Sequence, residues 1–125
     1  MNPRVLIVED EILVADDLEW QLTRMGYEVL AVASTGAEAI ALANDRRPDI
    51  VLMDIQLQGP MTGIEAAQVI RERTGASLIF VTAFAAVFLR EPGEMQRPGI
   101  CLSKPFSKLQ LKAALDATVR QTRNN

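Results

Sequence analysis

The sequence predicts an α/β domain built on a five-stranded parallel sheet, doubly wound so that helices cover both faces. Two observations lead to this fold class. Runs of consecutive apolar residues, as expected of strands buried on both faces, alternate with stretches of helical periodicity. Five strand–helix units follow one another, which is typical of a parallel sheet wrapped by helices. Because 125 residues with 49% hydrophobic content suffice for one core, we expect residues 1–125 to form a single domain.

Five apolar runs are the candidate strands. Short turn signals separate them from the helical stretches between them. In chain order they are Val5–Val8, Val29–Ala33, Ile50–Met53, Leu78–Val81 and Ile100–Leu102.

The first helix is expected at about Ile12–Met25. Val14, Leu18 and Leu22 recur on one face of this segment, and Gly26 provides a residue suited to ending a helix. Three further helices are predicted from capping boxes, in which a hydroxyl residue and a Glu or Gln three positions later satisfy each other's amides. The three pairs are Thr35 with Glu38, Thr62 with Glu65, and Ser107 with Gln110.

The last two helices differ in how clearly the sequence defines them. Leu111, Leu115 and Val119 recur at helical spacing and predict the core face of the last helix. After the fourth strand, the run 91–93 (Glu-Pro-Gly) interrupts the helical pattern, because Pro and Gly in a helix interior cost about 3 and 1 kcal/mol. We therefore expect a short or irregular fourth helix near residues 85–90.

Composition and charge narrow the class of protein. No run approaches the roughly 20 apolar residues of a membrane-spanning helix, so we expect a cytoplasmic protein with no membrane contact. The lone Cys101 excludes an internal disulfide, and its apolar neighbours favour a buried thiol. Residues 1–60 hold eleven acidic residues against four basic ones, which suits a cation site. The sequence has no run of Lys and Arg residues of the kind that binds nucleic acid, so we expect no direct contact with nucleic acid.

Polar residues follow four of the apolar runs where each strand should end: Glu9 and Asp10, Asp54, Thr82, and Lys104. The carboxyl ends of parallel strands meet at one edge of a sheet, where such folds bind ligands. Three carboxylates gathered there would repel one another, so a hard divalent cation such as Mg²⁺ is expected among them. Lys104 and the Thr82 hydroxyl suit an anion, and Asp54 beside a cation is a candidate acceptor of a phosphoryl group.

With these motifs the chain resembles the receiver domain of two-component response regulators over essentially its whole length. The matching residues follow the first, third, fourth and fifth strands in order: Glu9-Asp10, Asp54, Thr82-Ala83 and Lys104-Pro105-Phe106. The resemblance implies a flavodoxin- or CheY-like fold with strand order 2-1-3-4-5, and a bacterial signalling protein. It also implies a cis bond between Lys104 and Pro105.

The resemblance also implies a role for each site residue. Asp54 would accept the phosphoryl group, and Thr82 and Lys104 would bind its oxygens. The implied ligands of Mg²⁺ are Asp10, Asp54, the backbone carbonyl of Gln56 and, through a water molecule, Glu9.

By the same resemblance the chain would be a phosphorylation-dependent switch. It would catalyse its own phosphotransfer and the later hydrolysis of the aspartyl phosphate, although its main role would be signalling. The chain contains no histidine, so the phosphate must come from a histidine kinase, a histidine phosphotransfer protein or a small phosphodonor. We expect no effector domain after the last helix, so the output would be binding of a downstream protein, by a monomer or weak dimer. Met1 and the polar last residues favour a complete chain over a fragment of a larger regulator.

Three departures from the family pattern concern signal output: the interrupted fourth helix, Cys101 and the loop after Asp54. Cys101 stands three residues before the lysine, where receivers usually carry the Tyr or Phe that changes rotamer on activation. Phe84 or Phe88 is an alternative source of that aromatic ring, although core packing is the simpler explanation of both. The loop 56–63 is one residue longer than the commonest receiver version, so it is expected to order differently around the metal.

Two other functions remain as alternatives. A receiver-like interaction module or phosphate sink would keep the site but switch weakly, and the missing aromatic at Cys101 favours it. A haloacid-dehalogenase-type phosphatase also uses an aspartyl nucleophile and Mg²⁺, but it needs a second acid two residues later, where Gln56 stands.

An exposed apolar pair on the first helix is the remaining surface signal. Trp20 lies about 200° from Leu18 on a helical wheel, so we expect it to be partly exposed. With Leu13 it would form a small patch for a partner helix, although single surface aromatics are common.

Overall fold

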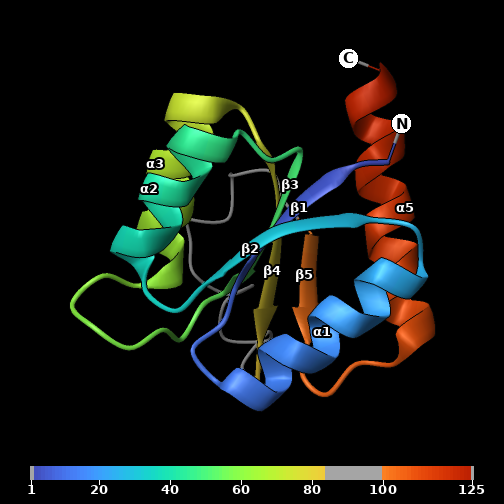
Figure 1. The fold of residues 1–125 in the computed structure, drawn as a ribbon, viewed down its shortest axis with the longest axis horizontal. Helices are drawn as coiled ribbons and strands as arrows, with labels where there is room; N and C mark the ends of the chain where they lie inside the picture. The colour runs from blue at the N-terminus through green and yellow to red at the C-terminus, as the bar shows by residue number, and fades with distance from the viewer. Residues whose placement is uncertain (1, 84–99, 125) are drawn as a thin grey trace.

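The computed structural model describes residues 2–83 and 100–124, with five strands and four helices in these ranges (Figure 1). No helix in them is long and apolar enough to cross a membrane. The expected fourth helix near residues 85–90, with Phe84 and Phe88, lies outside the described residues. The elements are β1 (Arg4–Val8), α1 (Ile12–Arg24), β2 (Glu28–Ala33), α2 (Gly36–Arg46), β3 (Ile50–Asp54), α3 (Gly63–Thr74), β4 (Ser77–Thr82), β5 (Ile100–Ser103) and α5 (Lys108–Asn124).

The five strands form one parallel sheet in the order β2-β1-β3-β4-β5. Val5 in β1 pairs with Val29 on one side and with Ile50 on the other, which makes β1 an inner strand. The chain therefore reverses its direction of winding next to β1, at the β1–β3 boundary. This arrangement confirms the predicted fold class and strand order.

Helices cover both faces of the sheet. In Figure 1, α2 and α3 lie on one face, and α1 and α5 lie on the other. Successive residues of a strand point to opposite faces, so each inner strand contributes to both layers. Leu6 and Val8 of β1 pack in the layer with α2 and α3, whereas Val5 and Ile7 pack with α1 and α5.

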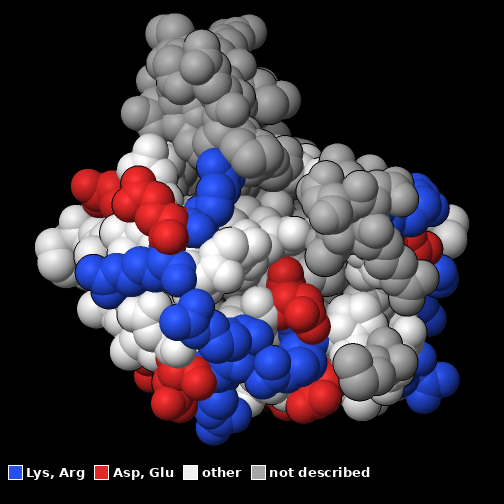
Figure 2. Space-filling view, turned by 90° about the horizontal axis from the view of Figure 1, so that it is seen from above, with Lys and Arg blue, Asp and Glu red and all other residues white. Residues whose placement is uncertain are grey.

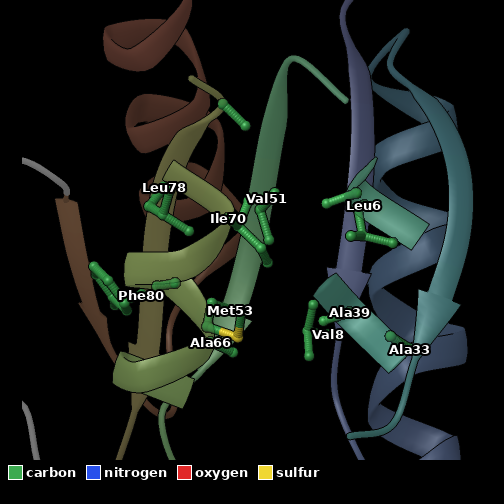
Figure 3. Close-up of a cluster of buried hydrophobic side chains, with 13 residues drawn as sticks. Leu6, Val8, Ala33, Ala39, Val51, Met53, Ala66, Ile70, Leu78 and Phe80 are labelled. Carbon is green, nitrogen blue, oxygen red and sulfur yellow. The ribbon is translucent and has the colours of Figure 1, made fainter. Parts of the chain in front are cut away.

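The core layer under α2 and α3 combines large strand residues with small helix residues (Figure 3). Phe80, Met53 and Leu6 fill the layer from the strands and are at most 1% exposed. Ala39 in α2 and Ala66 in α3 are fully buried, and their small side chains let the helices approach the sheet closely.

The layer under α1 and α5 confirms the predicted core faces of these helices. Leu18 and Leu22 of α1 are buried, as are Leu111 and Leu115 of α5, while Val119 is partly buried against the same cluster. Burial of a Leu side chain contributes about 1.5–3 kcal/mol.

Helix boundaries follow the predicted caps, with one correction. Complete capping boxes start α3, at Thr62 and Glu65, and α5, at Ser107 and Gln110. At α2 the Thr35 hydroxyl accepts from the amide of Glu38, but the Glu38 carboxylate accepts from Ser34 rather than Thr35. The reciprocal half of that box is therefore wrong, because the carboxylate reaches one residue further back.

Basic side chains gather across the face at which the strands begin, with carboxylates between them (Figure 2). Hydrogen bonds explain part of this gathering. The Arg4 guanidinium donates to the carbonyls of Arg46 and Arg47 at the end of α2, at 2.6 and 3.0 Å. Arg47 in turn donates to the carbonyl of Arg73 near the end of α3. Helix C-termini carry partial negative charge, so these arginines stabilise the helix ends.

Candidate functional site

Backbone hydrogen bonds align the polar residues at the carboxyl ends of the strands. The amide of Glu9 donates to the Ala33 carbonyl at 2.9 Å, and the amide of Lys104 donates to the Thr82 carbonyl at 2.8 Å. These bonds continue the sheet pairing beyond β1 and β5. The backbone beneath the site is therefore held by the same ladder that forms the sheet.

Three carboxylates meet at this edge, as the sequence predicts. Oxygen atoms of Glu9, Asp10 and Asp54 lie within 4.8 Å of one another. Glu9 and Asp54 are 3% and 4% exposed, so water screens their charges poorly, whereas Asp10 is half-buried. Acidic charge is concentrated where only a cation would relieve the repulsion.

Lys104 bridges the two buried carboxylates. Its Nζ lies 3.1 Å from Oε1 of Glu9 and 3.3 Å from Oδ2 of Asp54. The side chain of Lys104 is 25% exposed, whereas those of Glu9 and Asp54 are only 2% and 5% exposed. The bond between Lys104 and Pro105 is cis, as the family resemblance implies.

Burial and charge shift the pKa values of this pair upward. Burial raises the pKa of the Glu9 carboxyl and the Asp54 charge adds to it, although hydrogen bonds from the Glu11 amide and from Lys104 oppose the shift. For Lys104, burial lowers the pKa of the ammonium. The Glu9 hydrogen bond and the charges of Asp54 and Glu9 outweigh that effect, so the pKa lies above its ordinary value. Lys104 is thus firmly cationic at neutral pH.

Asp54 has a defined orientation within the cluster. It is the last residue of β3, and its Oδ1 accepts a hydrogen bond from the backbone amide of Gln56 at 3.0 Å. Its Oδ2 faces Lys104. Both carboxylate oxygens therefore have one protein donor, and the side chain of Gln56 points to solvent as an exposed group.

Thr82 lies at the end of β4 and is 2% exposed. β4 lies between β3 and β5, so Thr82 comes from the strand between those that lead to Asp54 and Lys104. The structure thus brings all six predicted site residues to one edge, from the ends of β1, β3, β4 and β5.

The loop after Asp54 makes contacts that sequence reasoning missed. Gln58 forms an isolated parallel bridge with Thr35, and the amide of Gly63 donates to the carbonyl of Ile55 at 3.0 Å. The signal for Gly63 was available, because a glycine directly follows the predicted N-cap Thr62 and so opens a helix. The bridge had no signal, because it joins residues of two loops.

Cys101 is less buried than the sequence predicts. It is partly buried and packs against the core layer under α2 and α3. Burial raises the pKa of its thiol, so the protonated form dominates at neutral pH.

The donor set fits a hard divalent cation. Mg²⁺ favours carboxylate oxygens together with water, and two of the three carboxylates are buried where one ammonium offsets only part of their charge. The residues therefore suit such an ion without rearrangement of the sheet.

Comparison with known proteins identifies the family. The model of the response regulator receiver domain matches residues 5–116. The phyllosphere-induced regulator PhyR of Methylorubrum extorquens is 35% identical over 92% of this chain and 43% of its own length. The transcriptional regulatory protein PdtaR of Mycobacterium tuberculosis is 38% identical over 96% of this chain and 58% of its own length.

Solved structures agree in fold over nearly the whole chain. The signal receiver domain of a modulated diguanylate cyclase from Desulfovibrio desulfuricans has a TM-score of 0.84 and 35% identity, covering 98% of each chain. The response regulator PhyR from Brucella abortus has a TM-score of 0.88 and 33% identity, covering 99% of this chain and 50% of that one. The chain spans about half the length of the curated relatives it matches. With its five-stranded parallel sheet and the acidic edge that Lys104 bridges, the chain belongs to the response regulator receiver domain family.

Proposed function

We propose that this receiver domain accepts a phosphoryl group on Asp54 and signals by binding another protein. The observation that carries the proposal is the position of the Asp54 carboxylate. It is buried, oriented by the amide of Gln56, and 3.3 Å from the ammonium of Lys104. A carboxylate held in this way can act as a nucleophile. The ammonium of Lys104 lies close enough to stabilise the negative charge of the phosphoryl group that it would accept.

In the transfer, a carboxylate oxygen of Asp54 forms a bond to phosphorus as the bond from phosphorus to the donor's leaving atom breaks. The electron pair of the broken bond leaves with the donor, an imidazole nitrogen when the donor is phosphohistidine. The transition state spreads negative charge over the phosphoryl oxygens, so catalysis depends on alignment and charge stabilisation. Lys104 supplies positive charge, and the Thr82 hydroxyl is the candidate hydrogen-bond donor.

The metal site belongs to the same proposal. Asp10, Asp54, the carbonyl of Gln56 and, through water, Glu9 would hold Mg²⁺. A bound Mg²⁺ would neutralise charge on the incoming phosphoryl group. Lys104 would exchange its contact with Asp54 for one with a phosphoryl oxygen, because the added group carries the charge further from the strand.

Signal output would follow from the two strands that carry Thr82 and Lys104. A phosphoryl group on Asp54 adds acceptor oxygens, which would draw the ends of β4 and β5 toward the site. Coupling of about 1–3 kcal/mol between such a site and a binding surface changes partner affinity about 5- to 150-fold. This is enough for a switch.

The proposed partners are a histidine kinase or histidine phosphotransfer protein as donor and a downstream protein as target. The donor must be external, since the chain has no histidine. The relatives support a regulatory target: a PhyR from Bartonella quintana is described as an anti-anti-sigma factor, and PdtaR as a transcriptional regulatory protein. Binding to a protein of a regulatory pathway is therefore the proposed output.

Intact-protein mass measured after incubation with Mg²⁺ and a small acyl-phosphate donor tests this function. We expect one added phosphoryl group on the wild-type chain and none on Asp54→Asn, because the amide is not a nucleophile. A chelated sample should also remain unlabelled. Full labelling of Asp54→Asn would place the acceptor elsewhere and contradict the proposal.

The alternative of a phosphate sink with weak switching rests on Cys101. In the described residues, Cys101 occupies the β5 position at which receivers usually carry an aromatic ring, and it packs into the core layer. Backbone amide spectra of the protein before and after phosphorylation distinguish the two functions. Shifts confined to residues beside Asp54 would indicate a sink, whereas shifts that extend along β4 and β5 would indicate a switch.

A further inference from the structure

Gly63 stands where helix chemistry alone would not place a glycine. It is the first residue of α3, directly after the N-cap Thr62, and it is buried. It does not adopt a positive φ, in contrast to Gly26, Gly59 and Gly75, so its backbone conformation is open to any residue. Alanine is favoured over glycine by about 1 kcal/mol in a helix interior, and at this first position the φ of Gly63 gives glycine no advantage either. A requirement outside the helix must therefore explain this glycine.

That requirement is the backbone of the residue that carries the acceptor carboxylate. A Cβ atom built on Gly63 would overlap with the carbonyl oxygen of Asp54 and lie 2.8 Å from Cα of Ile55. Both are backbone atoms at the end of β3, so neither can rotate away. The amide of Gly63 also donates to the carbonyl of Ile55 at 3.0 Å, which fixes the start of α3 against this turn.

We propose that Gly63 is a positioning residue for the phosphorylation site: its missing side chain lets α3 begin directly against Asp54 and Ile55. This contact sets where the Asp54 carboxylate and the Gln56 backbone lie. The inference rests on the proposed function, because it concerns the geometry of phosphoryl transfer and metal binding at Asp54. Gly63 itself touches neither the acceptor oxygens nor the incoming group.

The chain contains a matched control. α2 begins with the same pattern as α3: a threonine N-cap, a buried glycine at the first position and a glutamate at the third. A Cβ atom on Gly36 would lie 2.9 Å from Sδ and 3.0 Å from Cγ of Met61. These atoms belong to a flexible side chain that can move aside. The two glycines thus share helix position and burial and differ in what lies beside them.

The experiment compares wild type, Gly63→Ala and Gly36→Ala. Amide spectra of the metal-free proteins report the geometry of residues 54–56, calorimetry reports Mg²⁺ affinity, and intact mass reports the rate of labelling by the acyl-phosphate donor. We expect Gly63→Ala to shift the amides of residues 54–56, weaken Mg²⁺ binding and slow labelling by about 10- to 100-fold, since displacements near 1 Å cost up to about 100-fold. Gly36→Ala should stay within about threefold of wild type in both Mg²⁺ affinity and labelling rate, because the side chain of Met61 can move away from the added methyl group.

Two results would overturn the inference. One is a folded Gly63→Ala protein with wild-type amide positions at residues 54–56, wild-type Mg²⁺ affinity and wild-type labelling. The other is an equal loss of labelling and of Mg²⁺ affinity in Gly36→Ala, which would make the effect a general cost of changing these helix starts. If the wild type binds Mg²⁺ but is not labelled, the proposed function fails, and the role of Gly63 is still judged from Mg²⁺ affinity and amide positions.

A measurement on the wild type covers the case in which Gly63→Ala does not fold. During titration with Mg²⁺, the amide resonance of Gly63 should shift with the same midpoint as that of Gln56, because both amides are hydrogen-bonded to the β3 end. The amide of Gly36 should remain in place. A Gly63 resonance that does not move at saturating Mg²⁺ would overturn the inference.

Discussion

Lys104 has two roles that conflict in this geometry. Its ammonium offsets the charges of Glu9 and Asp54, which are buried beside each other. It also lies where a divalent cation would be attracted by the same carboxylates, so its positive charge opposes metal binding. Removing Lys104 should therefore change stability and metal affinity in opposite directions.

Lys104→Met keeps the length of the side chain and removes the charge. In chelated buffer at neutral pH we expect the free energy of unfolding to fall by about 1–3 kcal/mol, because two buried carboxylates lose the ammonium that donates to both of them. Mg²⁺ affinity should rise, since no ammonium competes for the acids. Urea denaturation and calorimetry measure the two effects.

Lys112→Met is the matched control for the loss of one lysine charge. Lys112 pairs with Asp116 at 3.0 Å, but its side chain is 54% exposed, so the pair contributes at most about 1 kcal/mol. The Mg²⁺ affinity of the Lys112→Met protein should equal that of wild type. A Lys104→Met protein as stable as Lys112→Met would contradict the role assigned to the bridge.

Two neighbouring residues at the start of α3 have different roles. Thr62 caps the helix through a complete capping box with Glu65, and Gly63 seats the helix against the end of β3. The cap acts on helix stability, whereas the glycine acts on the position of Asp54. Substitutions at these neighbouring residues should therefore separate stability from site chemistry.

Thr62→Ala should lower the free energy of unfolding by about 1 kcal/mol, because the amide of Glu65 loses the hydroxyl that accepts from it. Mg²⁺ affinity should remain close to that of wild type. Thr62→Ser, which keeps the hydroxyl, is the control and should retain most of the stability. Urea denaturation gives the comparison, and an unchanged midpoint for Thr62→Ala would show that the cap contributes nothing.

At the end of the molecule opposite the acidic edge, a hydrogen bond joins two parts of the chain that are distant in sequence. Tyr27, just before β2, donates its hydroxyl hydrogen bond to Asp116 of α5 at 3.3 Å, across 89 positions of sequence. The two residues line a cavity of about 340 Å³ together with Lys112 and Arg120. Burial raises the pKa of Tyr27 to about 12, with the charge of Asp116 adding to the shift.

The stability of the whole domain should therefore depend on alkaline pH. The unfolded chain loses the Tyr27 proton near the ordinary pKa of 10, before the folded chain does, so stability falls as pH rises from 10 to about 12. Below pH 10 this contribution is fully present. Tyr27 is the single tyrosine, so phenolate absorbance of the folded protein follows it directly. Asp116→Asn should lower the absorbance midpoint toward 10, and a wild-type midpoint already near 10 would contradict the assignment.

Much of the fold was predictable because its signals are local. Apolar runs identify the strands, and the caps at Thr62 and Ser107 identify helix starts within one residue. The hydrogen-bond partner of Glu38 was not predictable. Its flexible carboxylate can reach the amide of Ser34 or that of Thr35, and the conformation of the folded turn determines which of them it binds. The partial exposure of Trp20, at 59%, followed from helical periodicity alone.

The sequence alone determined which residues gather at the acidic edge, because parallel strands bring their carboxyl ends to one side whatever the details of packing. It also determined the family, since the motifs follow the strands in a fixed order. Only the tertiary structure decided that Lys104 spans both Glu9 and Asp54, and that Gly63 lies against the Asp54 backbone. These contacts join residues of different elements at separations of a few ångströms, and such distances depend on how the helices and strands pack together rather than on any local pattern.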